Sequence, residues 1–469
     1  MVFSEPFFLF VFLPLALVVI NLSAGRGHNV FILAFSLIFY YWSSGLATLV
    51  LVASIVVNWL LGLWLGRSSS KAVLSIGVAF NLLVLCFFKY AFFFSDNILR
   101  LVDSVQDNPF LGIVLPIGIS FYTFQGVAYL VDIWRKEIPA EKNLLTFAAY
   151  LSFFPQLVAG PIVRYKDVIH DYHQPKIHMD NVSAGLSRFA HGLLKKVLIA
   201  DNAGLVADAC FAVPPGELTM ADAWLGALAY AIQIYFDFSA YSDMAIGLGL
   251  VCGFRFLENF KHPYTSATIT DFWRRWHISL STWFRDYLYI PLGGNRVGRW
   301  ANLRNLVVVF LVTGLWHGAA WNFVLWGLYH GLFLIGEKLV LAKRAAQLRS
   351  FALRIGYMAP VIIIGWVLFR AEDLAHAMVV YSAMFDVTAQ SLALSEDVRP
   401  LLSSTTLLAM GVGVLAFAMP RDITVGMWLA QRSSIALEWV KLAYVAFAVI
   451  CGAILALQSD FSPFLYFRF

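Results

Sequence analysis

In the segment LVTGLWHGAAWNFVLWGLYHGLF, residues 311–333, two histidines, His317 and His330, are the only side chains that titrate near neutral pH. A helix of about 20 mostly apolar residues spans a bilayer, so a run of this kind can cross a membrane. Ionisable groups inside a membrane helix are costly and indicate a functional site. This segment therefore predicts a membrane helix and, on it, a candidate site.

The composition extends this prediction to the whole chain. Of 469 residues, 60% are hydrophobic and only 13% are charged, and the mean hydropathy is +0.75. Soluble domains carry about 25% charged residues, so these values exclude disordered and fibrous proteins and argue against a soluble enzyme. Because lipid offers no partner to backbone polar groups outside a helix, we expect an all-α, polytopic membrane protein.

The apolar runs divide the chain into candidate membrane segments. They cover residues 7–22, 29–42, 46–66, 72–94, 111–131, 144–162, 184–200, 222–252, 303–336, 355–370, 376–388, 403–420 and 437–458. Some are short, and 222–252 and 303–336 are long enough to break, so we expect about 11 transmembrane helices plus re-entrant or interfacial helices. No linker or repeat separates domains, which predicts a single membrane domain over residues 1–469.

The net charge of +5 is concentrated in one stretch. From Arg255 to Arg304 there are eight Lys or Arg and three Asp or Glu, which alone gives +5. A basic band in an apolar chain suggests lipid headgroups or an anionic ligand, and no solvated basic domain is present to hold nucleic acid. Basic loops alternate with non-basic ones, which places the N-terminus outside and the basic loops in the cytoplasm.

Several familiar catalytic and metal-binding patterns are absent from the sequence. The four cysteines form no CxxC pair, so we expect no metal site and no disulfide. The Walker, HExxH and GxSxG patterns are also missing. An ATP-driven pump or a serine hydrolase is therefore disfavoured.

A second informative segment is TDFWRRWHISLSTWFRDYLYIPLGGNR, residues 270–296. On one continuous helix its apolar and charged side chains separate onto opposite faces. The apolar face carries Trp273, Trp276, Leu280, Trp283, Phe284, Tyr287 and Leu288, and the other face carries Arg274, Arg275, Thr282, Arg285 and Asp286. His277 falls within the apolar face, where a neutral imidazole is tolerated better than a cation. It is either a core histidine bonded to a carbonyl or a functional group.

Glycines flank one of the two intramembrane histidines. Gly314 and Gly318 lie on either side of His317 and allow a helix break or a close backbone approach. Asn322 is near enough in sequence to orient the ring. The alternative is a hydrogen bond between helices, which is favoured more for His330 than for His317.

Two aspartates lie in a third apolar run, QIYFDFSAYSDMAIGLGL at residues 233–250. Asp237 and Asp243 are six residues apart, which places them about 120° apart on a regular helix. They therefore form no ready-made carboxylate pair for acid–base work. Nearby hydroxyls such as that of Tyr241 could satisfy them, and we expect each aspartate to pair with an Arg or His. A proton or ion path is the alternative.

Long motifs in a fixed order resemble those of the membrane-bound O-acyltransferase family. They are MVFSEPFFLFVFLPL at 1–15, LPIGISFYTFQGVAYLVDIWR at 115–135, FFPQLVAGPIVRYKD at 153–167, YFDFSAYSDMAIGLGL at 235–250, DFWRRWHISLSTWFRDYLYIPLGGNR at 271–296, GLWHGAAWNFVLWGLYHG at 314–331 and FLYFRF at 464–469. The chain is most similar to bacterial alginate O-acetyltransferase-like proteins. The resemblance runs end to end and thins between residues 340 and 455.

The resemblance implies tilted helices around a central tunnel that reaches both faces of the membrane. It also implies that His317, in the WHG motif, is catalytic and that His277, in the RWH motif, is the second site residue. A buried neutral histidine can take the proton of a hydroxyl that receives an acyl group from a thioester, and we assign that role to His317. His277 would orient the donor or stabilise the oxyanion.

Other residues are candidates for binding and support in the same site. Candidate donor-binding residues are Arg274, Arg275, Arg285, Trp273, Trp276, Trp316 and Asn322, and candidate supporting residues are Asp237, Asp243, Tyr241 and His330. The implied donor is acetyl-CoA, whose phosphates suit the basic band; headgroup anchoring explains the same arginines equally well. No bound cofactor or metal is expected.

The resulting prediction is a multi-pass inner-membrane enzyme that O-acetylates an exported polysaccharide such as alginate, with a separate periplasmic protein as partner. Within the family, the alternatives are transfer of D-alanine from a carrier protein and O-acylation of peptidoglycan. Two alternatives belong to other classes of protein. In a transporter, the intramembrane Asp and His residues would form a proton or substrate path. In an export scaffold, they would have no catalytic role. Transporters often show internal repeats, and none is visible here.

Overall fold

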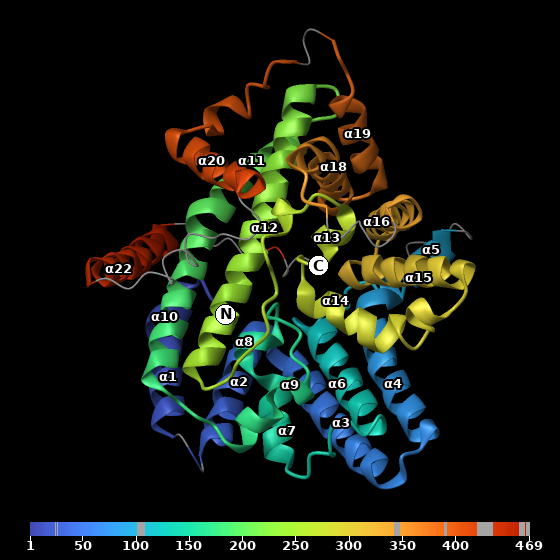
Figure 1. Ribbon diagram of the computed structural model, residues 1–469, viewed down its shortest axis with the longest axis vertical. Helices are drawn as coiled ribbons and strands as arrows, with labels where there is room; N and C mark the ends of the chain where they lie inside the picture. The colour runs from blue at the N-terminus through green and yellow to red at the C-terminus, as the bar shows by residue number, and fades with distance from the viewer. Residues whose placement is uncertain are drawn as a thin grey trace. The chain divides into compact units, whose positions relative to one another are not determined.

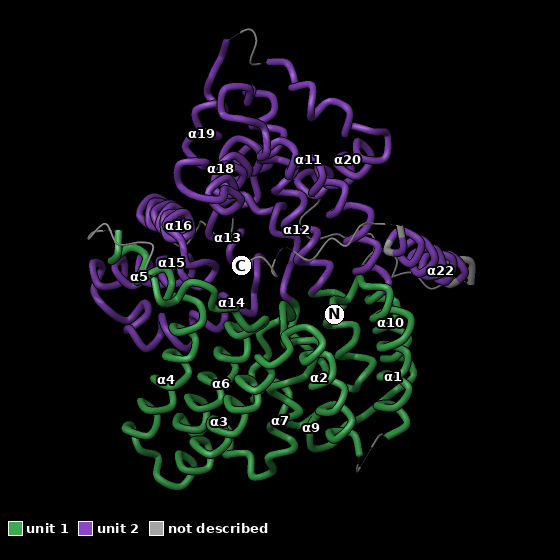
Figure 2. The backbone as a smooth tube through the Cα atoms, turned by 180° about the vertical axis from the view of Figure 1, so that it is seen from behind, with its two compact units in different colours: residues 1–189, 242–258 green, residues 190–241, 259–469 purple. Residues whose placement is uncertain are grey.

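The computed structural model describes residues 1–23, 25, 27–100, 108–341, 348–388, 392–419, 435–458 and 465. Every regular element in these ranges is a helix (Figure 1), which confirms the all-α prediction. The motif at 464–469 lies outside the described residues except for Leu465. The chain divides into two compact units, which Figure 2 shows in separate colours.

Unit 1 comprises Met1–Phe189 and Ser242–Glu258. Its elements are η1 (Phe8–Phe12), α1 (Leu13–Leu22), α2 (His28–Ser44), η2 (Gly45–Ala47), α3 (Thr48–Ser68), α4 (Lys71–Leu85), η3 (Cys86–Tyr90), α5 (Ala91–Arg100), α6 (Ile119–Trp134), α7 (Leu144–Ser152), α8 (Phe154–Leu157) and α9 (Tyr165–His173). The apolar helices α3 and α4 pack on each other and on α6. Between them Asn58 and Asn81 exchange two amide hydrogen bonds of 3.1 and 2.7 Å, which satisfies polar groups inside an apolar layer.

Unit 2 comprises Ala190–Tyr241 and Asn259–Phe469. Two of its boundaries with unit 1 fall inside α10 (Met179–Leu194) and α12 (Met220–Val251), and the third falls between Glu258 and Asn259, outside any helix. Its other elements are η5 (Lys195–Ala200), α11 (Asp201–Ala212), η6 (Pro263–Thr265), α13 (Ile269–Trp273), α14 (Ile278–Phe284), η7 (Arg285–Tyr289), η8 (Gly294–Arg296), α15 (Arg299–His317), α16 (Trp321–Val340), α17 (Phe351–Leu353), η10 (Arg354–Met358), α18 (Ala359–Arg370), α19 (Leu374–Met384), η12 (Arg399–Leu401), α20 (Ser404–Ala418) and α22 (Ile435–Gln458). Helix α16 packs against α15, α18 and α13.

Glycines allow α15 and α16 to approach closely as an antiparallel pair. A Cβ atom at Gly314 would lie 2.3 Å from the carbonyl oxygen of Phe323, and one at Gly327 would lie 2.2 Å from that of Phe310. The apolar run 303–336 therefore breaks into two helices, as its length suggested. The run 222–252 does not break, because α12 is continuous from Met220 to Val251.

The single helix predicted over residues 270–296 is wrong, because α13 ends at Trp273 and α14 begins only at Ile278. The carboxylate of Glu337 accepts the backbone N–H groups of Ile269 and Thr270 at 2.6 and 2.7 Å. It thereby satisfies the first donors of α13. A separate short helix therefore begins at Ile269, where a carboxylate from α16 binds its first N–H groups. A helical wheel of residues 270–296 does not include that carboxylate.

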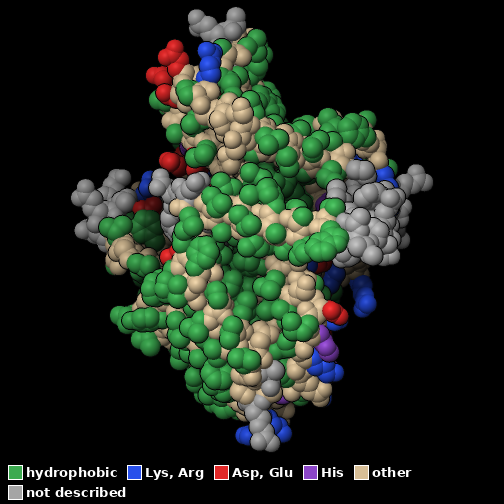
Figure 3. All heavy atoms as spheres, turned by 90° about the vertical axis from the view of Figure 1, so that its left-hand side faces the viewer, with side chains coloured by type: hydrophobic (Ala, Val, Ile, Leu, Met, Phe, Trp, Pro, Cys, Tyr) green, Lys and Arg blue, Asp and Glu red, His purple; other side chains and the backbone are tan. Residues whose placement is uncertain are grey.

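Four continuous helical stretches among the described residues are long and apolar enough to cross a membrane, and three of them join consecutive elements. They are His28–Ser68, Lys71–Arg100, Trp321–Val340 and Phe351–Arg370. Large apolar side chains are also exposed on other helices, such as Leu408 of α20 and Trp439 of α22, and hydrophobic side chains cover much of the face in Figure 3. Apolar surface of this extent indicates contact with lipid. The larger number of spanning helices stays a prediction.

Candidate active site

His277 lies in the bend between α13 and α14 and is only 1% exposed. Its backbone has φ 44° and ψ 56°, in the left-handed region that costs a non-glycine residue about 1–2 kcal/mol. Nδ1 of the ring lies 3.1 Å from Oδ1 of Asn259, and the ring of Phe238 from α12 stands edge-on at 4.6 Å. A strained backbone that buries an imidazole is typical of a functional position.

The burial of His277 predicts a pH dependence of stability. Burial lowers the pKa of His277 from 6.5 to about 3, whereas the unfolded chain binds this proton near pH 6.5. The contribution of the neutral ring to the free energy of unfolding is therefore present above pH 6.5 and is lost as the pH falls toward the lowered pKa. Between pH 7 and pH 5 we expect the wild-type protein to lose about 2 kcal/mol more unfolding free energy than His277→Asn.

Asparagine suits the comparison because it tolerates the left-handed backbone and does not titrate. Unfolding in detergent micelles at the two pH values measures the difference. The same pH dependence in both proteins would show that His277 is not a buried neutral ring.

His317 is the last residue of α15, and its side chain is buried in an aromatic cluster of unit 2. Its ring centroid lies 4.9 Å from that of Trp316, 5.1 Å from that of Trp326 and 5.0 Å from that of Phe369. These rings come from α15, α16 and α18, so three helices converge on the imidazole. The site around His317 is therefore shielded from water.

The structure brings the two predicted catalytic histidines to one indole. The ring of Trp316, which packs on His317, also lies 6.0 Å from the ring of His277. The glycine of the WHG motif is required by packing, because a Cβ atom at Gly318 would lie 2.2 Å from the ring of Phe323. Residues 40 positions apart in the sequence thus share one cluster.

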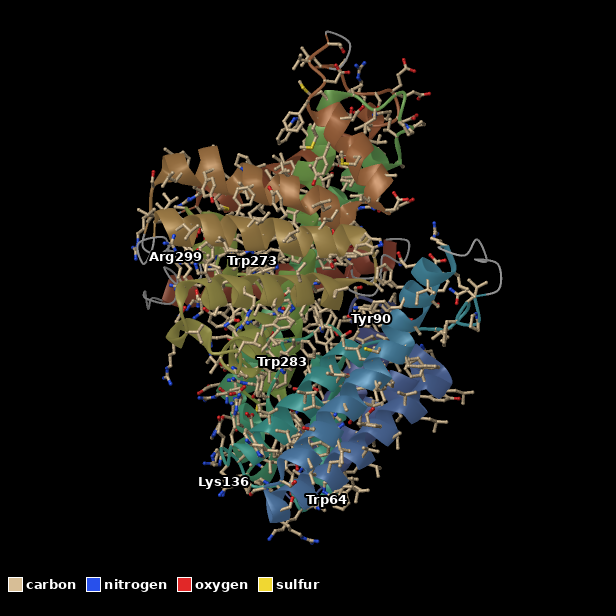
Figure 4. The ribbon with its side chains drawn as sticks, turned by 90° about the vertical axis from the view of Figure 1, so that its right-hand side faces the viewer. Trp64, Tyr90, Lys136, Trp273, Trp283 and Arg299 are labelled. Carbon is tan, nitrogen blue, oxygen red and sulfur yellow. The ribbon has the colours of Figure 1, made fainter. Side chains whose placement is uncertain are left out.

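His330 lies on α16 and is fully buried beside the same cluster. Its ring lies 5.1 Å from those of Trp273 and Trp326, and Figure 4 shows Trp273 on the side of the molecule where α15 and α16 lie. Neither ring nitrogen has a hydrogen-bond partner within the described part of the chain, so the alternative of an interhelical hydrogen bond finds no support there. A supporting role for His330 stays a prediction.

The candidate donor-binding arginines have different surroundings. Arg275 bonds the carboxylate of Asp271 at 3.1 Å, and Arg285 bonds that of Asp286 at 2.7 Å. Arg274 is exposed. Because a carboxylate partly offsets the attraction of its arginine for an anion, Arg274 is the best placed of the three to bind one.

The other candidate donor-binding residues lie within the helix packing. Trp276 is buried with its ring 5.0 Å from that of Trp366. Nδ2 of Asn322 donates to the carbonyl oxygens of Leu368 and Ala371 at 3.2 and 2.9 Å, where α18 ends. Asn322 therefore ties α16 to α18, and its contact with a donor stays a prediction.

Each of the two aspartates of α12 pairs with its own cation. In unit 2, Oδ1 of Asp237 lies 2.8 Å from Nζ of Lys196. In unit 1, Oδ1 of Asp243 lies 2.9 Å from Nη2 of Arg188. Separate pairing was expected, and Asp243 has the expected arginine, but the partner of Asp237 is a lysine rather than an Arg or His. Tyr241 is buried on the same helix.

Sequence reasoning missed Asn259, Phe369 and Glu337. Asn259 lies in an irregular segment before α13, and no motif or periodicity marks it. Phe369 reaches His317 only through the packing of α18. Glu337 did leave a signal, because it is the first charged residue after residues 305–336, which contain no Lys, Arg, Asp or Glu.

Apolar helices that bury two histidines in one aromatic cluster have the features of a membrane enzyme that uses imidazole as a base. Residues 37–370 match the membrane-bound O-acyltransferase family. The chain belongs to this family and is an acyltransferase of the membrane.

Curated relatives extend the match to the whole chain. The probable alginate O-acetylase of Pseudomonas putida is 42% identical over all of both chains. The peptidoglycan O-acetyltransferase of Helicobacter pylori is 34% identical over the whole of this chain and 98% of its own. The teichoic acid D-alanyltransferase of Bacillus subtilis is 30% identical over 46% of this chain and 58% of its own. All three names describe transfer of an acetyl or alanyl group to a polymer.

Proposed function

We propose that this chain moves acetyl groups from acetyl-CoA in the cytoplasm across the inner membrane for O-acetylation of an exported polysaccharide such as alginate. The observation that carries the proposal is the 42% identity, over the full length of both chains, to a protein named a probable alginate O-acetylase. About 11 helices around a tunnel open to both faces would let donor and acceptor meet at the histidines. A separate periplasmic protein would complete the transfer to the glycan.

The chemistry assigned to the site is transfer of an acetyl group from a thioester to a hydroxyl. Neutral His317 takes the hydroxyl proton as the oxygen attacks the thioester carbonyl. The new C–O bond forms, the C–S bond breaks, and the departing thiolate takes up the proton. The rings of Trp316, Trp326 and Phe369 exclude water that would hydrolyse the thioester. Exposed Arg274 would bind a donor phosphate.

A second candidate function is transfer of D-alanine, or of an acyl group to peptidoglycan. The similarity to a teichoic acid D-alanyltransferase and to a peptidoglycan O-acetyltransferase favours it. The net charge of +5 would suit an acidic carrier protein as well as acetyl-CoA, so charge does not separate the two.

Mass spectrometry of the acids that mild alkali releases from envelope polysaccharides tests the proposal. The comparison is between cells that contain the chain and cells that lack it. Loss of acetate in the second set is the expected result and also names the glycan. Loss of alanine would assign the chain to D-alanyl transfer, and unchanged esters would contradict acyl transfer to the envelope.

A further inference from the structure

Asn259 holds the bend that carries His277 through both its backbone and its side chain. It is fully buried, and its carbonyl oxygen accepts the N–H of Ile278 at 2.9 Å. Its Oδ1 accepts the backbone N–H of Ser279 at 3.2 Å and the hydroxyl of Ser279 at 2.9 Å. The same Oδ1 lies 3.1 Å from Nδ1 of His277. One residue therefore fixes both the chain after His277 and one side of its ring.

The backbone N–H of Ser279 determines the tautomer of His277. A backbone N–H can only donate, so the Asn259 atom that faces it is the carbonyl oxygen and not the NH₂ group. This oxygen also faces Nδ1 of His277, and a carbonyl oxygen can only accept. Nδ1 therefore carries the proton, and in a neutral imidazole Nε2 is then an acceptor.

The surroundings of the ring favour the neutral form. The neighbours that pack on it from other helices include Phe238 of α12 and Trp316 of α15, both uncharged. Asn259, in the irregular segment before α13, and Ser279, in the first turn of α14, are also uncharged. Burial lowers the pKa of His277 to about 3, so the Nδ1–H tautomer persists across the physiological range.

We propose that Asn259 is a positioning residue that presents His277 to the reaction as a hydrogen-bond acceptor through Nε2. This rests on the proposed acyl transfer and decides between the two roles open to His277. Stabilising an oxyanion needs a donor, which Nε2 of this tautomer is not. His277 instead accepts a hydrogen bond from a substrate hydroxyl or N–H group other than the attacking hydroxyl, whose single proton goes to His317, and so orients the bound substrate.

Two substitutions of Asn259 test the proposal in membrane vesicles supplied with ¹³C-acetyl-CoA, by the label recovered in alkali-labile esters. Asn259→Ala removes the acceptor, and we expect the rate to fall about 10- to 100-fold at every pH. Asn259→Asp keeps an acceptor for all three donors, so at pH 8 it should recover most of the wild-type rate.

The pH profile of Asn259→Asp separates the two roles of His277. The introduced carboxylate raises the pKa of His277, so the ring gains a proton as the pH falls toward 6 and Nε2 can no longer accept. We expect the rate of Asn259→Asp to fall over this range while the wild-type rate changes far less. A rate that rises toward pH 6 would mean that His277 acts as a donor and would overturn the proposal.

Matched controls come from Asn202 and from a double variant. Asn202 lies on α11, and its amide bonds the carbonyl of Leu198 at 3.0 Å, so Asn202→Ala and Asn202→Asp should keep the wild-type profile. In a His277→Asn background, Asn259→Ala should cause no further loss. If the rate losses of His277→Asn and Asn259→Ala multiply in the double variant, this inference is overturned and the proposed function is not. Wild-type vesicles that transfer no acetyl group would overturn the proposed function, and this inference with it.

Discussion

Alanine in place of His317 is expected to abolish acyl transfer and to leave the protein folded in the membrane. A histidine base contributes typically 10²–10⁴-fold, so transfer of label from ¹³C-acetyl-CoA should fall at least about 100-fold. The rings that pack on His317, those of Trp316, Trp326 and Phe369, carry no group that could replace a base. The loss should therefore not be rescued by a neighbour.

A second variant separates lost chemistry from lost packing. His317→Gln keeps most of the side-chain volume and a polar group but cannot act as a base near neutral pH, so it should be as inactive as His317→Ala. His178→Ala is the matched control, because His178 is exposed ahead of α10. It should transfer acetyl groups at the wild-type rate. An active His317→Gln at an equal membrane level would show that His317 is not the base.

Methionine in place of Lys196 is expected to lower the free energy of unfolding by about 3–5 kcal/mol. Lys196 is 2% exposed, and its ammonium lies 2.7 Å from Asp201 and 2.8 Å from Asp237. Methionine fills the space of the lysine but leaves the carboxylate of Asp237, itself 2% exposed, without its cation. Unfolding in detergent micelles at fixed pH measures the loss.

Two further variants serve as controls for Lys196→Met. Lys176→Met removes an exposed lysine and should leave stability unchanged, because surface charges contribute little. Adding Asp237→Asn to Lys196→Met removes the buried charge and should recover part of the loss. Lys196→Met that is as stable as Lys176→Met would show that the pair has no stabilising role.

The helices could be predicted because their signals are local. The apolar runs fix where the chain must be helical in lipid, and the glycines beside His317 marked where 303–336 breaks. The continuity of α12 was not predicted, because the apolar run 222–252 is longer than one membrane crossing needs. Asp237 also places a charge inside this run. The charge is balanced by Lys196, which lies on η5 and not on α12.

The bend at His277 could not be predicted from its own segment. A helical wheel assumes an unbroken helix, and the break depends on the carboxylate of Glu337 and on Asn259. These side chains come from other parts of the chain, and their contacts exist only after folding. The helical wheel nevertheless placed Trp273, Trp276 and His277 on the buried side, and all three are buried in the structure. A buried bend favours the same apolar and aromatic residue types as the buried face of a helix.

The most direct test of acyl transfer by His317 is the ester acetate on envelope polysaccharide, measured by mass spectrometry after mild alkali. Cells carrying the wild-type chain, His317→Ala or His178→Ala are compared at equal membrane levels of the three proteins. We predict acetate in the wild-type and His178→Ala cells, and only the background of cells without the chain in His317→Ala. Equal acetate in all three would contradict acyl transfer through His317.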